Sequence, residues 1–121
     1  MDNFKSTTRV IKGLSDENRL RIMGLLDSRK DLCVCEITAI IGLSQPTISS
    51  HLKLLESAGL IDHKKDGLWV NYSISSQIDP DIKAVLGGVL SAIRKSKTVK
   101  DDIRRLSRID REKLCSRRKP G

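Results

Sequence analysis

The chain has 121 residues, a length typical of one domain, and 23 Lys and Arg against 15 Asp and Glu give it a formal charge of +8. Its only aromatic residues are Phe4, Trp69 and Tyr72, so the core must be aliphatic, which favours packed helices. No apolar run approaches the ~20 residues of a membrane span, and the N-terminus lacks a signal-peptide profile. We therefore expect a cytoplasmic protein with no membrane partner.

The positive charge is unevenly distributed along the chain. Residues 1–93 hold 11 basic and 11 acidic side chains, whereas residues 94–121 hold 12 basic and 4 acidic ones. This excess implies a polyanionic partner, most simply nucleic acid, although a basic tail that only aids solubility is the alternative. An enzyme is not expected, because the chain shows no nucleophile and base constellation, phosphate loop or acid pair.

The first half of the chain predicts four helices. The first covers about residues 3–14, and Ser15 is expected to cap a second, buried helix. A short amphipathic helix, with apolar residues at Val34, Ile37, Ile40 and Ile41, ends at Gly42. Ser44 then caps a helix with Pro46 in its first turn. The last two helices form a helix-turn-helix, whose second helix normally enters the major groove of DNA.

The second half predicts a hairpin and one long helix. Residues that favour β-structure flank a turn at Asp66-Gly67, and Lys64 and Lys65 would lie at the tip of this wing. Pro80 introduces a helix over 82–93 whose continuous apolar stripe needs a partner surface.

The pattern thins after Lys97, which predicts a frayed helix and then a disordered basic end. The predicted domain organisation is therefore a DNA-binding and dimerisation domain over residues 1–97 and a basic, partly disordered tail over 98–121 that carries Cys115.

The segment from Ser44 to Leu60, SQPTISSHLKLLESAGL, closely resembles the recognition helix of the ArsR/SmtB family of winged-helix repressors. The segment from Asp66 to Tyr72 is similar to the wing of that family, and the resemblance extends from about Thr8 to about Ile93. It implies a mainly α fold with a small β wing. It also implies a homodimer that binds double-stranded operator DNA and releases it when a metal or metalloid ion, or another signal, is sensed.

The segment Asp31-Leu32-Cys33-Val34-Cys35-Glu36 resembles the thiolate segment of the arsenic- and antimony-responsive members, and also that of the cadmium and lead sensors. Within a regular helix Cys33 and Cys35 would point ~200° apart, so they can share an ion only at a helix start or in an extended segment. Binding would then distort the helix-turn-helix. Thiolates favour thiophilic ions. The alternative is that Cys33 or Cys35 is only a small hydrophobic residue buried in the core.

A third sulfur ligand is expected for As(III) or Sb(III), but the position of a third cysteine in some related sequences is Ile37 here. Cys115 is the only other thiol, and either it completes the site or an exogenous thiol or hydroxide does. The zinc-responsive members of the family use a cluster of carboxylates and histidines on the last helix of the dimer. In this chain the histidines, His51 and His63, both lie in the predicted DNA-binding half, so a zinc site of that type is unsupported. The cadmium and lead sensors add cysteines from an N-terminal arm, and residues 1–32 of this chain contain none. As(III) is therefore the favoured inducer, followed by Sb(III).

The candidate DNA-binding residues are the polar positions of the recognition helix and the wing. Such side chains read base edges or bind phosphates, although they also simply solvate an exposed helix. They are Gln45, Thr47, Ser49, Ser50, His51, Lys53, Lys64 and Lys65.

Together these observations predict a metalloid-responsive repressor of transcription that leaves its operator when Cys33 and Cys35, with Cys115, bind As(III) or Sb(III). No cofactor is needed for DNA binding itself. The alternatives are a repressor that senses Cd(II) or Pb(II), a thiol redox switch in which Cys33 or Cys35 forms a disulfide with Cys115, and a DNA-binding module without a ligand.

Overall fold

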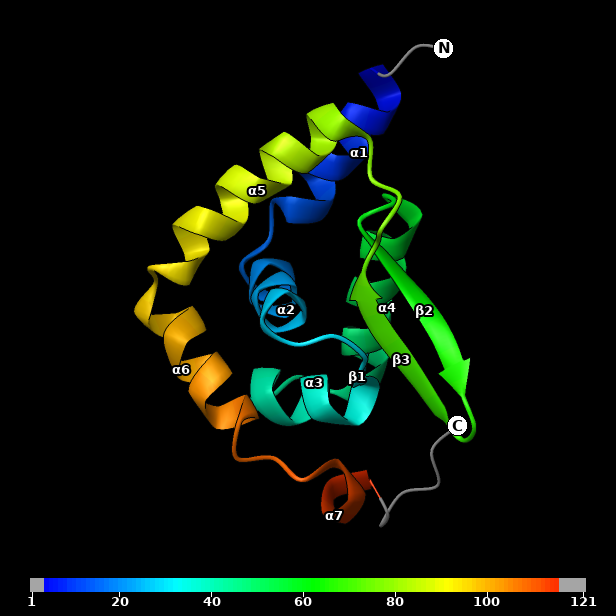
Figure 1. The fold of residues 1–121 in the computed structure, drawn as a ribbon, viewed down its shortest axis with the longest axis vertical. Coiled ribbons are helices and arrows are strands. Elements are labelled where there is room, and N and C mark those ends of the chain that lie inside the picture. The colour runs from blue at the N-terminus through cyan, green and yellow to red at the C-terminus, as the bar shows by residue number, and fades with distance from the viewer. Residues whose placement is uncertain (1–3, 116–121) are drawn as a thin grey trace.

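A computed structural model describes residues 4–115, with the side chains of residues 4–114. It contains a helix-turn-helix followed by a β-hairpin, as the sequence predicts (Figure 1). The helices are α1 Phe4–Leu14, α2 Glu17–Ser28, α3 Val34–Ile41, α4 Gln45–Ser57, α5 Pro80–Arg94, α6 Lys97–Leu106 and α7 Arg111–Cys115, and the strands are β1 Leu32–Cys33, β2 Ile61–Asp66 and β3 Trp69–Ile74. No helix among residues 4–115 is long and apolar enough to cross a membrane.

The residues that end and cap the helices in and before the helix-turn-helix act as the sequence predicts, with one exception. Gly42 ends α3 with a left-handed φ of 81°, which a residue without a Cβ adopts easily, and Ser44 caps α4 through a hydrogen bond from the Thr47 N–H. The cap of α2 is a correction, because Asp16 rather than Ser15 accepts the N–H of Arg19. The Ser15 hydroxyl instead donates to the carbonyl of Lys12. The hydrogen bond that Asp16 accepts from the Arg19 N–H lowers the pKa of the Asp16 carboxyl group.

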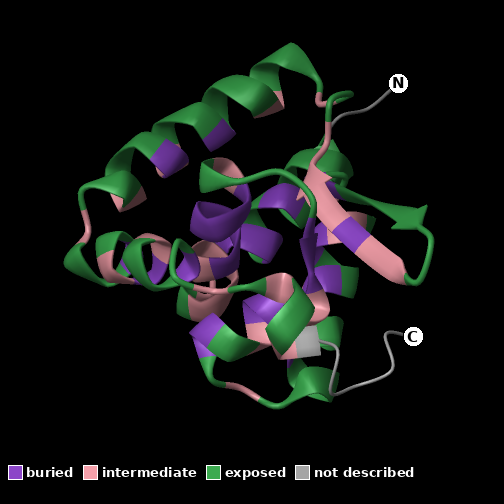
Figure 2. Ribbon diagram, turned by 60° about the horizontal axis from the view of Figure 1, so that its bottom comes forward, coloured by how far each residue is buried: buried purple, intermediate pink, exposed green. Residues whose placement is uncertain are grey.

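The three strands form an antiparallel sheet in the order β1-β3-β2. In β2 only Ile61 is buried, so the hairpin projects from the body as a wing (Figure 2). The tight turn lies at Gly67-Leu68, one residue later than predicted, because Asp66 is still paired with Trp69. Gly67 has a φ of 61°, which matches the type II′ hairpin, where glycine stands first.

An aliphatic core joins the helices and the base of the wing, as the scarcity of aromatic residues predicts. Its fully buried side chains come from α2, β1, α3, α4, the start of the wing and the end of α6. They include Ile22, Met23, Leu25, Leu32, Ile37, Ile48, Leu52, Leu55, Leu60 and Ile61. The helix-turn-helix therefore rests on α2.

The region after residue 97 differs from the predicted frayed helix. Helix α6 is regular and packs on α2, with Val99 and Leu106 buried, so the folded unit continues past the predicted boundary. Gly24 allows this close approach, because a Cβ there would lie 2.9 Å from Val99 Cγ1. The predicted disordered end from residue 116 onward lies outside the described residues.

A buried ion pair fixes α6 to α2. Asp102 is 2% exposed and accepts two hydrogen bonds of 2.9 Å, from Nε and Nη2 of Arg21. This carboxylate raises the pKa of Arg21. Asp102 lies within the predicted basic tail, yet in the structure it is a buried residue.

The apolar stripe of α5 is divided between the core and the surface. Leu86 and Leu90 are buried within the protomer, at 3% and 6% exposure, so they do not belong to an outer interface. Most of the helix is exposed (Figure 2), including Val85 at 40%. Phe4 and Ile11 of α1 are also exposed large apolar residues.

Candidate DNA-binding surface and thiol site

Helix α4 buries one face and exposes the predicted recognition face. Ile48, Leu52 and Leu55 are buried in the core. The exposed polar positions are Gln45, Thr47, Ser49, Ser50 and Lys53. One of these hydroxyls is already engaged in the helix cap, because Thr47 Oγ1 lies 2.9 Å from Ser44 Oγ. The remaining amide, hydroxyl and ammonium groups provide the donors and acceptors that reading a major groove requires.

His51 is half-buried and is held by an arginine that the sequence analysis did not identify. Arg19 Nη1 lies 3.2 Å from His51 Nδ1, and its Nε donates to the carbonyl of Gly13. A guanidinium only donates hydrogen bonds, so Nδ1 must accept, and the ring hydrogen is on Nε2. The His51 ring is therefore held at the edge of the exposed face of α4 by a residue of α2.

The wing is attached directly to the recognition helix. His63 Nδ1 of β2 lies 2.9 Å from Oε1 of Glu56 in α4, which fixes the hairpin relative to that helix. Lys64 and Lys65 are both exposed on β2. The hairpin that carries the two lysines is therefore connected to the recognition helix, with Lys64 and Lys65 on opposite faces of β2.

The basic excess of the C-terminal region is partly used inside the molecule. Arg94 donates to Asp27, Arg104 to Asp101, and Arg105 Nη2 to the carbonyl of Ile40 at 2.7 Å. Arg111 pairs with Glu36. Arg94, Arg105 and Arg111 join α5, α6 and α7 to other elements, whereas Arg104 pairs within α6, so the charge count overstates the positive surface available to a polyanion.

The two thiols lie where the sequence analysis expected them, at the start of the helix that precedes the recognition helix. Cys33 is the N-cap of α3 and is 3% exposed, whereas Cys35 stands at the second position of the helix and is half-buried. Glu36 Oε1 accepts the N–H of Cys33 at 3.0 Å, as in a capping box. Among the described side chains no group of three metal-ligating residues is preassembled. The side chain of Cys115, the third predicted ligand, lies outside the described residues.

The thiol segment and the wing share one row of the sheet. Asn71 of β3 pairs with Cys33 of β1 on one side and with Lys64 of β2 on the other. Residues directly opposite each other in an antiparallel sheet lie on the same face. Cys33 is therefore separated from Lys64, a lysine of the wing, by the single intervening residue Asn71.

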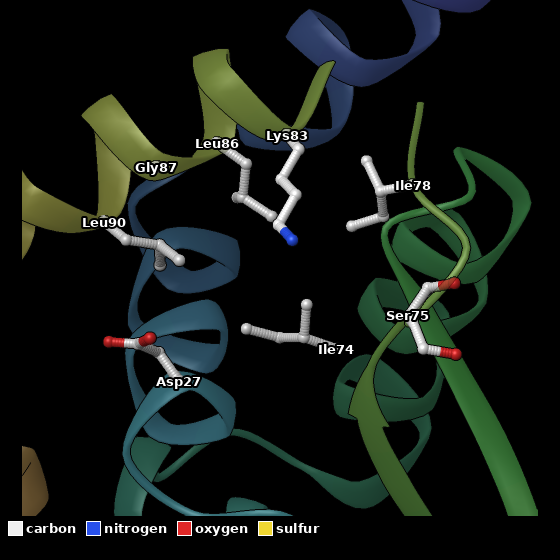
Figure 3. A pocket seen from close by; sticks show the side chains of 9 residues that line it. Asp27, Ile74, Ser75, Ile78, Lys83, Leu86, Gly87 and Leu90 are labelled. Carbon is white, nitrogen blue, oxygen red and sulfur yellow. The ribbon is translucent and has the colours of Figure 1, made fainter. Parts of the chain in front are cut away.

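A separate cavity of about 310 Å³ opens between α5, the end of β3 and α2. Figure 3 shows aliphatic side chains of Ile74, Ile78, Leu86 and Leu90 around it, with Lys83 and Asp27 at its sides. None of its lining residues is a thiol or a predicted DNA-binding residue. The cavity therefore does not belong to either candidate site.

Comparisons with known proteins agree with this architecture. The family model "Bacterial regulatory protein, arsR family" matches residues 16–63. The arsenic resistance transcriptional regulator ArsR2 of Pseudomonas putida is 36% identical over 110 residues, which cover 88% of this chain and 94% of that protein. Its relative ArsR1 is 40% identical over 83 residues, 69% of this chain and 65% of that protein, so the chain spans slightly less than two thirds of this relative.

The cadmium resistance regulatory protein CadC of Listeria innocua is 45% identical over 71 residues, covering 59% of this chain and 60% of that protein. Among solved structures, HlyU from Vibrio cholerae has a TM-score of 0.62 at 30% identity and covers 78% of this chain and 96% of that chain. The homodimeric winged helix-turn-helix domain Mb0332 from Mycobacterium bovis has a TM-score of 0.63 at 26% identity, covering 77% and 82%. These relatives are named as regulators of transcription, not as enzymes.

Proposed function

Because the chain belongs to the arsR family of bacterial regulatory proteins, we propose that it is a cytoplasmic transcriptional repressor that binds operator DNA and dissociates when Cys33 and Cys35 bind As(III) or Sb(III). The observation that carries this proposal is the position of the two thiols. They occupy the N-cap and the second residue of α3, the helix that leads into the recognition helix. Ion chemistry at this point acts directly on the DNA-binding unit.

The chemistry of release follows from the helical geometry. Cys33 is the extended N-cap of α3 and Cys35 is its second residue, so the pair stands at a helix start, where two thiols can converge on one ion when the first turn bends or opens. Opening breaks the hydrogen bond from the Cys33 N–H to Glu36 and disturbs the pairing of Cys33 with Asn71. The binding energy of soft thiolates for a thiophilic ion drives this change.

Cys115 is proposed as the third ligand. It is the last residue of α7, and α7 packs on α3, the helix that carries Cys35. Trivalent arsenic bound by three protein sulfurs then needs no exogenous ligand. If Cys115 does not bind the ion, a small thiol or hydroxide completes the coordination.

On the DNA side, α4 enters the major groove and the wing contacts the backbone. Gln45 and Ser49 read base edges, whereas Lys53, Lys64, Lys65 and the Nε2–H of His51 bind phosphates or base edges. Two copies bind together through the exposed apolar residues of α1 and α5. The homodimeric Mb0332 structure supports this assembly.

The test is an operator titration followed by fluorescence anisotropy, with a duplex selected from a random pool by the ion-free protein. Arsenite and antimonite should release the wild-type protein. Cys33→Ser and Cys35→Ser should bind the duplex normally but resist release, because DNA affinity resides in other residues. Cys115→Ser should respond more weakly, and X-ray absorption should count three sulfurs around arsenic in the wild type and two in this variant. Release of a Cys33→Ser, Cys35→Ser double variant by arsenite contradicts the proposal.

A second candidate is a response to Cd(II), favoured by the 45% identity to CadC. Thiolates bind this soft ion as well, so the same titration includes Cd(II), Zn(II) and peroxide as separate arms. Release by Cd(II) but not by arsenite assigns the second function. Release by peroxide alone assigns a redox switch.

A further inference from the structure

Arg111, at the start of α7, connects the thiol segment to the wing. Its Nε lies 3.0 Å from Glu36 Oε1, and its Nη2 donates to Asn71 Oδ1 at 2.8 Å. The guanidinium carbon lies 5.2 Å from the centre of the Trp69 ring. One side chain from the C-terminal region thereby contacts α3 and two residues of β3.

These contacts bracket Cys33 from both sides. Glu36 Oε1, which binds Arg111, is the same oxygen that accepts the backbone N–H of Cys33. Asn71, the other partner of Arg111, is the residue that pairs with Cys33 across the sheet. Glu36 and Asn71 are both buried, at 3% and 6% exposure. Cys33 therefore cannot leave its position without disturbing two residues to which Arg111 is bonded.

The same contacts reach the DNA-binding surface. Asn71 pairs with Lys64 on its other side, and Trp69 pairs with Asp66 at the end of the hairpin. A guanidinium has a planar, rigid array of donors, so it transmits the positions of Glu36 and Asn71 to one another. The same Nη2 also donates to the backbone carbonyl of Asp31, just before β1, so the guanidinium joins the thiol segment and β3 at three points.

Building on the proposed function, we propose that Arg111 is the positioning residue that couples ion binding at Cys33 and Cys35 to the wing. In the ion-free protein Arg111 holds the α3 cap and β3 together in the arrangement that binds DNA. When the first turn of α3 opens around an ion, Glu36 moves away from Cys33, the guanidinium loses its bridge to Asn71, and the wing is no longer held against α3. Without Arg111, the thiols bind the ion but the wing does not respond.

The experiment compares Arg111→Gln and Arg111→Lys with the wild type. Arg108→Gln is the matched control, because it removes the same charge from an exposed residue between α6 and α7. Three quantities are measured: arsenite affinity from thiolate–arsenic absorbance, operator affinity with and without saturating arsenite, and the emission of Trp69, the single tryptophan of the chain.

We expect Arg111→Gln to bind arsenite, while the factor by which arsenite weakens operator binding falls roughly tenfold below the wild-type factor. Arg111→Lys should lie between them, because it keeps the charge but not the fork. Arsenite should shift Trp69 emission in the wild type and in Arg108→Gln but not in Arg111→Gln. A residue needed only for folding would change operator affinity without changing this factor.

An unchanged factor in folded Arg111→Gln, judged by circular dichroism, overturns the coupling role. If that variant does not fold, an unchanged factor in Arg111→Lys does so. Failure of the proposed function is a different result, because the wild-type protein then binds no arsenite or stays on the operator when arsenite is bound.

Discussion

The ion pair between Arg21 and Asp102 predicts how strongly α6 contributes to stability. Asp102→Ala leaves the guanidinium of Arg21 without its partner. Breaking a buried pair typically costs 3–5 kcal/mol, and the Arg21 side chain keeps 22% of its exposure and is partly hydrated, so we expect a loss near the lower end, about 3 kcal/mol. For a domain of this size the loss lowers Tm by roughly 12 °C.

Urea and thermal unfolding at one fixed protein concentration measure this loss, because association of the chain contributes to apparent stability. Asp101→Ala is the matched control: it removes a neighbouring carboxylate whose side chain is 42% exposed and pairs with Arg104. Such a surface pair contributes at most about 0.5 kcal/mol. A loss below about 1 kcal/mol for Asp102→Ala, or equal losses for the two variants, would refute the placement of α6 in the folded core.

Three further predictions concern DNA, assembly and acid. Gln45→Ala should change base preference within the operator, whereas Lys64→Ala should weaken all sequences alike and reduce the salt slope by about one; equal losses on operator and random DNA for both variants would remove the assigned roles. Ile11→Glu combined with Val85→Glu should give a folded monomer in sedimentation, because both residues are exposed in the protomer, and a persistent dimer would place the interface elsewhere. The pKa of Asp16 is lower in the folded than in the unfolded protein, so its cap stabilises the fold at pH values above the unfolded pKa, near 4. This stabilisation is lost as the pH falls through the folded pKa. The stability advantage of the wild type over Asp16→Asn should therefore shrink between pH 5 and 3, and a constant difference would contradict the cap.

The sequence predicts the elements whose signals are local. Gly42, Ser44 and Pro46 mark the turn and the start of α4, and the hydrophobic spacing of α4 correctly separates its buried face from its polar face. The wrong prediction of the α2 cap also has a local cause. Ser15 and Asp16 are adjacent potential caps, and the carboxylate takes the role because its oxygen reaches the N–H of Arg19.

What the sequence does not predict depends on contacts between distant segments. Arg21 and Asp102 are 81 residues apart, and neither differs in the sequence from a solvated surface charge. Arg111 and Glu36 are 75 residues apart and are equally inconspicuous. From its many charges and few apolar residues the sequence predicts a tail over this helix, although one buried pair and a close approach at Gly24 pack it against α2. A better signal would be paired changes at such positions among related sequences.

The row formed by Cys33, Asn71 and Lys64 has a consequence for how such a regulator can diverge. Two strand spacings of roughly 4.8 Å separate Cys33 from Lys64 along this row, which crosses the sheet beside the buried core residue Leu32. Substitutions in the aliphatic core act first on stability, whereas a substitution at Asn71 acts on the pairing that joins β1 to the wing. Under the proposed function, a change of inducer therefore involves this row of the sheet more than the interior formed by α2 and α4.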